Sequence, residues 1–228
     1  TAAVLGNPTL TTAEIINYIR CADVFDEDED SDTAENRAII TGDVLHSEPM
    51  VVQYNFPDNS SKTMVYFGAN DGMLHAILDE TDPDVDVIND ETNHGTEEWA
   101  FIPPDQLHRL KDLVEGLNHE YYVDSSPKVY FHDVDDDGII DAPDGDKVIL
   151  ICGERAGGTS YFALDVTDPS APSYLWRIDQ SNSKTGILEL RDTSIYINNS
   201  GSFQDGEVLR IWDGAGGWGH AIEHEPRE

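Results

Sequence analysis

The sequence predicts a mainly β fold, a modified and partial β-propeller with short helical insertions. From Ile39 onward, short apolar runs alternate with Gly, Asp, Asn and Pro, which is typical of many short strands. Two segments repeat one pattern of strand, tight turn, return strand and tryptophan. Hairpin repeats of roughly 40 to 50 residues are typical of propeller blades, each of which packs against its neighbours.

The N-terminal part, residues 1–38, is expected to lead into the domain as a helix followed by an acidic loop. In TTAEIINYIR, Thr11 or Thr12 is placed to cap the helix, and Glu14 follows near the third position. The run FDEDEDSDTAEN, residues 25–36, has no apolar period. We interpret it as a solvated loop, with a second, looser cation site as the alternative.

Residues 39–178 are expected to form the propeller blades, and residues 179–228 a diverged further blade or the end of a fragment. The candidate strands are MVVQYNF, KTMVYFGA, LHAILDE, KVYFHDV, DKVILICG, SYFALDV, YLWRI, SIYIN and VLRIWDG. One segment differs, because leucines recur at helical spacing in DQLHRLKDLVEGL, residues 105–117. This segment predicts an amphipathic helix or helical insertion.

The two repeats end in tryptophans that have two interpretations. MVYFGANDGMLHAILDE is followed by EEWAFI, and KVILICGERAGGTSYFALDV is followed by YLWRI. In a propeller, Trp99 and Trp176 would fill the space between blades, whereas in a β-sandwich they would be ordinary core anchors. Too few blades are present to close a ring of the usual size, which favours a fragment of a propeller.

Composition restricts the class of partner. The chain has 13 basic and 46 acidic side chains and a formal charge of −33, which repels phosphate backbones and anionic lipids. We therefore expect no nucleic-acid partner. The excess carboxylates indicate a salt-adapted surface, a site for divalent cations, or both.

No apolar run is long enough to insert into a membrane, and the N-terminus lacks the pattern of a signal peptide, so a cytosolic chain and a mature fragment both stay open.

The two cysteines do not indicate a compartment. Cys21 and Cys152 are far apart and do not have a zinc-binding spacing, which argues against a zinc site on a cysteine cluster. A single disulfide and two buried reduced thiols are both consistent with this pair.

The stretch FHDVDDDGIIDAPDGDK, residues 131–147, predicts a metal site. Counted from Asp133, oxygen ligands recur at positions 1, 3, 5, 7 and 9, and a glycine at position 6 permits a sharp turn. Hard oxygen ligands in this number favour Ca²⁺ over Mg²⁺ and over transition metals. The expected ligands within this calcium loop, residues 133–141, are Asp133, Asp135, Asp137, the backbone carbonyl of Ile139, and Asp141.

The loop differs from an EF-hand because its position 12 is Asp144 rather than Glu, and no long helices flank it. Asp136 should point to solvent and Ile140 to the core. The alternative is a solvated aspartate turn, in which unneutralised carboxylates would repel one another.

No HExxH, G-x-S-x-G, Walker or Rossmann pattern is present, and we therefore expect no enzyme.

Several motifs together resemble the C-terminal propeller domain of type IV pilus tip adhesins and biogenesis factors, the PilY/PilC family. They are GDVLHSEPMVV (42–52), VYFGANDGMLHA (65–76), EEWAFIPP (97–104), YYVDSSPKVY (121–130) and GGTSYFALDVTDPSAPSYLWRI (157–178). The resemblance covers residues 12 to about 178. Residues 179–228 lack the Trp-Ser-x-Pro stretch that the family usually shows.

The resemblance implies a secreted, pilus-associated fimbrial module at the pilus tip or outer-membrane surface of a Gram-negative bacterium. It implies support of pilus biogenesis, regulation of retraction, cell adhesion, and contact with minor pilins and with host or abiotic surfaces. It also implies calcium binding by the same five ligands. Two alternatives stay open: a quinoprotein-like propeller dehydrogenase, and a purely structural acidic cell-surface domain.

Overall fold

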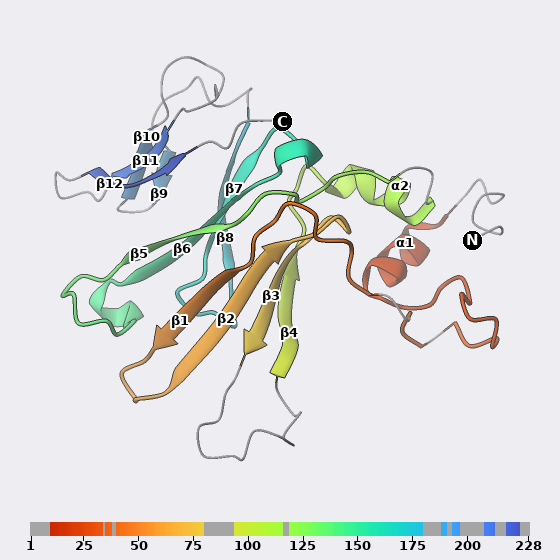
Figure 1. Ribbon diagram of the computed structural model, residues 1–228, viewed down its shortest axis with the longest axis horizontal. Coiled ribbons are helices and arrows are strands. Elements are labelled where there is room, and N and C mark those ends of the chain that lie inside the picture. The colour runs from red at the N-terminus through yellow and green to blue at the C-terminus, as the bar shows by residue number, and fades with distance from the viewer. Residues whose placement is uncertain are drawn as a thin grey trace.

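The computed structural model contains three four-stranded antiparallel sheets, so the mainly β prediction is confirmed (Figure 1). The structure describes residues 10–33, 35–37, 40–79, 94–115 and 119–179, together with the backbone of 188–190, 193–196, 208–212 and 218–223. In each sheet the strands are neighbours in chain order, which is the up-and-down arrangement of a propeller blade. Of the described helices, none has the length and apolar character that would allow it to cross a membrane.

The first sheet, here called blade 1, consists of β1 (Met50–Asn55), β2 (Ser61–Gly68), β3 (Leu74–Asp79) and β4 (His94–Phe101). Blade 2 consists of β5 (Lys128–His132), β6 (Lys147–Gly153), β7 (Tyr161–Asp165) and β8 (Ser173–Ile178). The third sheet consists of β9 (Leu188–Leu190), β10 (Thr193–Tyr196), β11 (Val208–Trp212) and β12 (Trp218–Glu223). The segment VLRIWDG thus contributes β11, which pairs with β10 and β12.

The main core lies between blades 1 and 2. It includes Tyr54, Tyr66 and Leu74 from blade 1, and Leu150 and Phe162 from blade 2, all fully buried. Alternation along the strands explains this core, because successive side chains of a strand point to opposite faces of its sheet. A second cluster, which contains Trp176, covers the other face of blade 2.

Trp99 lies between the blades, as the propeller prediction expects. Its ring packs against the main core, 5.7 Å from the ring centre of Tyr66. Its indole N–H donates to the carbonyl oxygen of Pro169 at 2.7 Å, and Pro169 belongs to the β7–β8 connection. The tryptophan of blade 1 therefore also holds a loop of blade 2.

The N-terminal helix α1 (Thr12–Ile19) has the expected capping box. The Thr11 hydroxyl accepts the backbone N–H of Glu14, and the Glu14 side chain accepts the Thr11 N–H at 2.8 Å. In the expected helix 105–117, a 3-10 turn, η2 (Leu107–Arg109), precedes α2 (Leu110–Glu115). The turn forms because Arg109 N–H bonds to the Gln106 carbonyl three residues back. Residues 116–118 lie outside the described part.

Both cysteines are free thiols in the structure. Cys152 is buried in β6 among core residues, and Cys21 is partly exposed after α1. Burial raises the pKa of the Cys152 thiol far above its ordinary value, which disfavours the reactive thiolate. Of the two alternatives from the sequence, the structure has the reduced thiols, although only Cys152 is buried as expected.

Candidate metal centre

The acidic loop between β5 and β6 brings three of the expected ligands together. Carboxylate oxygens of Asp133, Asp135 and Asp137 lie within 4.8 Å of one another. Asp141 does not belong to this group, although it lies in the same connection at the start of the 3-10 turn η3 (Ala142–Asp144). Ile139 follows Asp137 by two residues. The structure therefore assembles three carboxylates of the predicted set.

Backbone N–H groups hold these carboxylates in place. Asp133 accepts the N–H of Asp136 at 2.7 Å and that of Gly138 at 2.8 Å. Asp137 accepts the N–H of Ile139 at 2.8 Å. Asp136 and Gly138 have left-handed backbones, with φ of 61° and 78°. A Cβ at Gly138 would meet nothing within 4 Å, so the turn requires glycine for its backbone conformation and not for space.

The base of the loop is closed by Asp146, which the sequence reasoning missed. Asp146 is buried and accepts two backbone N–H groups, those of Val134 at 2.9 Å and Asp141 at 2.8 Å. These bonds join the two ends of the loop immediately before β6. The signal in the sequence was an aspartate directly before an apolar strand, but seven aspartates in one stretch concealed it.

The loop is also docked onto blade 1. Ile140 is 7% exposed and belongs to the main core, as expected, and its N–H donates to the Asn55 carbonyl at 2.8 Å. The Asn55 side-chain amide donates to the Gly138 carbonyl at 3.3 Å. Asn55 is the last residue of β1. A hairpin of blade 2 is therefore fixed to the end of a strand of blade 1.

The surroundings of the loop shift the pKa values of its carboxyl groups in opposite directions. The backbone N–H of Gly138 lowers the pKa of Asp133. Partial desolvation and then the charges of Asp137 and Asp133 raise the pKa of Asp135. For Asp141, partial desolvation and then the charges of Asp144 and Asp146 raise the pKa. Clustered carboxylates are a donor set suited to a hard divalent cation, because the cation would neutralise the repulsion between them.

The N-terminal acidic loop contains two further groups of this kind. The structure brings together Asp23, Asp28 and Glu35, and also Asp26, Asp28 and Asp30. Both oxygens of the buried Asp23 already accept the N–H of Glu27. The alternative of a second cation site in residues 25–36 stays a prediction.

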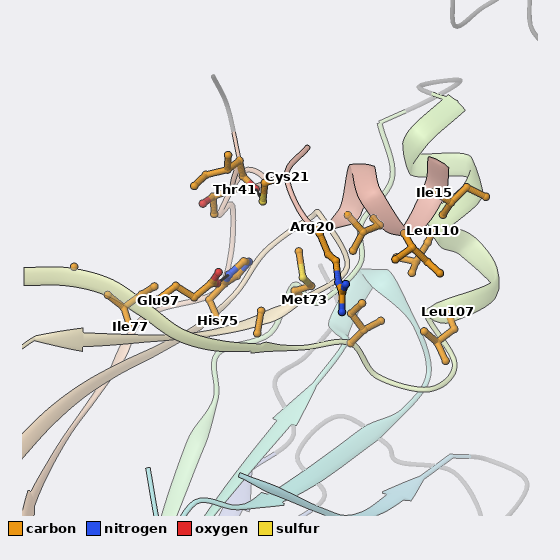
Figure 2. A pocket seen from close by; sticks show the side chains of 16 residues that line it. Ile15, Arg20, Cys21, Thr41, Met73, His75, Ile77, Glu97, Leu107 and Leu110 are labelled. Carbon is orange, nitrogen blue, oxygen red and sulfur yellow. Dashed lines mark hydrogen bonds and ion pairs between the residues drawn. The ribbon is translucent and has the colours of Figure 1, made fainter. Parts of the chain in front are cut away.

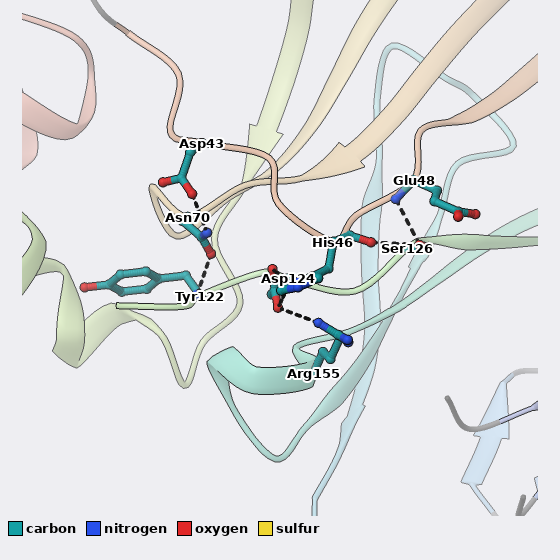
Figure 3. A network of polar contacts seen from close by, with 8 residues as sticks. All are labelled: Asp43, His46, Glu48, Asn70, Tyr122, Asp124, Ser126 and Arg155. Carbon is teal, nitrogen blue, oxygen red and sulfur yellow. Dashed lines mark hydrogen bonds and ion pairs between the residues drawn. The ribbon is translucent and has the colours of Figure 1, made fainter. Parts of the chain in front are cut away.

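Polar contacts join the motifs on which the family resemblance rests (Figure 3). His46 Nδ1 donates to the Asp124 carboxylate at 2.8 Å, and Arg155 Nη1 lies 3.4 Å from the same carboxylate. The N–H of Glu48 donates to Ser126 Oγ at 2.9 Å. The segment before blade 1 is therefore bonded to the segment before blade 2.

A second set of contacts in Figure 3 is centred on the turn between β2 and β3. The Asn70 amide donates to Asp43 at 3.0 Å, and its oxygen accepts the N–H of Tyr122 at 3.1 Å. Asn70 is buried, so these bonds satisfy a polar side chain that would otherwise destabilise the fold. The GANDG turn is thus a junction between the two blades.

A cavity of about 620 Å³ lies between α1 and the outer side of β3 and β4 (Figure 2). Its lining is mainly aliphatic, with Ile15 from α1, Ile77 from β3 and Leu110 from α2. His75 and Glu97 also line it, and they are hydrogen-bonded to each other at 2.6 Å. This cavity does not follow from the sequence alone, because it depends on the position of α1 relative to the sheet.

Comparison with known proteins decides the family. A family model described as the PilY1 beta-propeller domain matches residues 47–190, which is more than half of the chain. The chain belongs to the PilY1 beta-propeller family. The resemblance drawn from the motifs and the propeller fold class are both confirmed.

Two relatives of this PilY1 family are named as pilus proteins. The type IV pilus biogenesis factor PilY1 of Pseudomonas aeruginosa strain PAO1 is 35% identical over 176 residues, which cover 66% of this chain and 13% of that protein. A PilY1 homolog of Xylella fastidiosa is 30% identical over 207 residues, which cover 81% of this chain and 15% of the homolog. The chain therefore spans a small part of the curated relatives that it matches.

A solved structure is also similar to this chain. The crystal structure of the Pseudomonas aeruginosa PilY1 C-terminal domain is 28% identical, with a TM-score of 0.37, and the match covers 72% of this chain and 29% of that one.

Proposed function

We propose that this chain is a calcium-binding propeller segment of a type IV pilus biogenesis factor. The observation that carries the calcium proposal is the convergence of the Asp133, Asp135 and Asp137 carboxylates. Membership of the PilY1 beta-propeller family supports the pilus role, because the curated relatives are named as pilus biogenesis factors.

Calcium is the cation that this donor set fits best. The three carboxylates are hard oxygen ligands, and the calcium loop offers two more, the carbonyl of Ile139 and the carboxylate of Asp141. Ca²⁺ accepts six to eight oxygen ligands in flexible geometry, whereas Mg²⁺ requires a nearly ideal octahedron and retains its waters. Because Asp141 lies outside the grouped carboxylates, the loop would have to move for its carboxylate to join the site.

When bound, the ion would neutralise the repelling carboxylates. The consequence for the fold follows from the residues around the loop. Asn55 and Ile140 link the loop to blade 1, and Asp146 closes its base. An ordered loop would therefore strengthen the contact between the two blades, so that calcium binding stabilises the folded state by linkage.

In the whole protein, this segment would lie outside the cell, at the pilus tip or outer-membrane surface of a Gram-negative bacterium. We propose minor pilins as its partners, with host or abiotic surfaces as the target of adhesion. Calcium would then couple the external ion concentration to pilus assembly, retraction and attachment.

Calorimetric titration of the metal-stripped chain with Ca²⁺, with Mg²⁺ as competitor, tests the ion proposal. Asp135→Asn and Asp136→Asn form a matched pair, because each removes one charge from the same loop and only Asp135 belongs to the carboxylate group. We expect Asp135→Asn to weaken calcium binding by about tenfold or more and Asp136→Asn to change it little. Equal affinities in the two variants would refute the assignment.

Asp141→Asn in the same titration decides whether the fourth carboxylate takes part. A loss comparable to that of Asp135→Asn places Asp141 in the site, and an unchanged affinity restricts the site to the three grouped carboxylates.

The pilus role is tested separately, by introducing Asp135→Asn into the parent gene and measuring surface pili and twitching over a range of calcium concentrations. Calcium-dependent piliation in the unaltered strain, absent in the variant, is the expected result.

A further inference from the structure

Two carboxyl groups from different blades meet beside the β6–β7 turn. Glu154 follows the last residue of β6 and is 1% exposed. Asp105 comes from the connection between β4 and η2. Ser160 binds both groups, because its N–H donates to Glu154 Oε2 at 3.2 Å and its hydroxyl donates to Asp105 Oδ2 at 2.5 Å. One small residue therefore holds the two acids side by side.

Each acid has one oxygen without a donor. Glu154 Oε1 and Asp105 Oδ1 are buried, and neither has a hydrogen-bond partner among the residues that the structure describes. A buried acceptor without a donor costs free energy, and two ionised carboxylates in one site also repel each other. A single proton between them would remove both penalties.

The charged groups around the pair favour a proton over a metal ion. Arg177 Nη1 from β8 lies 3.6 Å from Asp105 Oδ1, and Arg109 of η2 donates to Gln106 Oε1 at 2.8 Å. Two guanidinium groups and only two carboxylates make a poor site for a divalent cation. The other titratable groups nearby, Cys152 of β6 and Tyr174 of β8, interact electrostatically with Glu154 and Asp105 respectively.

We propose that Glu154 and Asp105 share one proton, carried by Glu154, which locks the connection from blade 1 against the β6–β7 turn of blade 2. Glu154 is the carrier because it is the more deeply buried acid, whereas Asp105 forms an ion pair with Arg177. The site is closely fitted, since a Cβ at Gly158 would lie 1.8 Å from Glu154 Oε2.

The electrostatics agree with this assignment. Burial, followed by the charge of Asp105, raises the pKa of Glu154 to about 7, although the amide of Gln106 partly offsets the effect. The ordinary value for glutamate is 4.5. Between these two values the folded state holds a proton that the unfolded state has released, so stability falls as the pH rises from about 4.5 to about 7. The contact between the connection from blade 1 and the β6–β7 turn is therefore stabilised in mildly acidic conditions and weakened above neutral pH.

Glu154→Gln tests the proposal, because its amide supplies the missing donor without a titrating group. The matched control is Glu48→Gln, which removes one charge from an exposed side chain. Thermal midpoints from pH 5 to pH 8 are measured in EDTA. We expect the midpoint of the unaltered chain and of Glu48→Gln to fall more steeply with pH than that of Glu154→Gln. Identical slopes in all three proteins would overturn the proposal.

Infrared difference spectroscopy gives a direct readout that does not depend on stability. A carbonyl stretch of a protonated carboxylic acid should be present at pH 6 in the unaltered chain and absent in Glu154→Gln. If Glu154→Gln does not fold, Asp105→Asn replaces it, because removing the neighbouring charge should shift the loss of this band to lower pH. A pH slope that millimolar Ca²⁺ abolishes in the unaltered chain would indicate a bound cation and overturn the shared proton.

Discussion

Blades 1 and 2 are built on the same pattern of paired strands. In blade 1, Ala76 of β3 faces Trp99 of β4, and in blade 2, Ala163 of β7 faces Trp176 of β8. In both blades the register shifts immediately after that alanine, as in a β-bulge. The small alanine side chain leaves room for the indole, and the bulge changes the direction in which the following side chains point.

The first hairpin of each blade differs. In blade 1 the β1–β2 connection is residues 56–60, a short turn with Asn59 in a left-handed conformation. In blade 2 the β5–β6 connection is residues 133–146, which contains the acidic loop. The strands and the core between the blades accommodate both connections, so the candidate ion site is an insertion into an unchanged framework.

The second turn of each blade also carries one buried acid, Asp71 in blade 1 and Glu154 in blade 2, but the two acids are neutralised differently. In blade 1, the imidazole of His75 lies between Asp71, at 3.0 Å, and Glu97, at 2.6 Å. In blade 2, Glu154 lies beside a second acid, Asp105. A buried charge must be compensated by a partner. In blade 1 the partner is a histidine, and in blade 2 we propose that a shared proton removes one of the two charges.

The largest effect is expected from breaking the framework that the blades share. Phe162→Ala removes a fully buried ring from the core between the blades and should lower the free energy of unfolding by about 3 to 5 kcal/mol. Phe131→Ala is the matched control, because Phe131 is 44% exposed in β5 and should cost less than about 1 kcal/mol. Urea denaturation of both variants measures the difference. Equal losses would mean that the two blades do not share a core.

Removing the histidine of blade 1 should have the next largest effect. His75→Gln leaves two carboxylates without their cation and should cost roughly 2 to 4 kcal/mol at pH 6. Although burial opposes its charged form, the hydrogen bonds that His75 donates to Asp71 and Glu97 raise its pKa to about 9, from an ordinary 6.5. A raised folded-state value means that the stabilisation is complete below about 6.5 and is lost as the pH rises through about 9.

The expected result is a pH-dependent gap between the two proteins. Denaturation of the unaltered chain and of His75→Gln from pH 6 to pH 10 should show a difference that narrows toward high pH. A constant difference over this range would mean that His75 acts only by packing.

A smaller effect is expected from the loop that only blade 2 has. Gly138→Ala forces a Cβ into a left-handed backbone and should cost about 1 kcal/mol in EDTA, because no atom crowds the position. Gly138→Asn should cost less, since asparagine tolerates this conformation, as Asn59 does in blade 1. Thermal denaturation of the two variants makes the comparison. A larger loss in Gly138→Asn than in Gly138→Ala would refute the conformational explanation.

Features that depend on neighbouring residues were predicted well. The capping box of Thr11 and Glu14, the strands of blades 1 and 2 other than β4, and the inward position of Ile140 all follow from short-range patterns. The helical insertion expected in residues 105–117 is present, but its first turn is 3-10 and the α-helix begins at Leu110. Leucine spacing indicates a helical segment but not which hydrogen bonds its first turn makes.

The sequence by itself determined the blade repeat, the acidic loop and its turn at Gly138, because strand alternation and left-handed turns are properties of adjacent residues. Only the tertiary structure decided which distant residues support them. Asn55 holds the loop, Asp146 closes it, and Ser160 brings Glu154 to Asp105. The physical reason is that a buried polar group is satisfied by whichever chain segment the packing brings beside it, and packing is a property of the whole core.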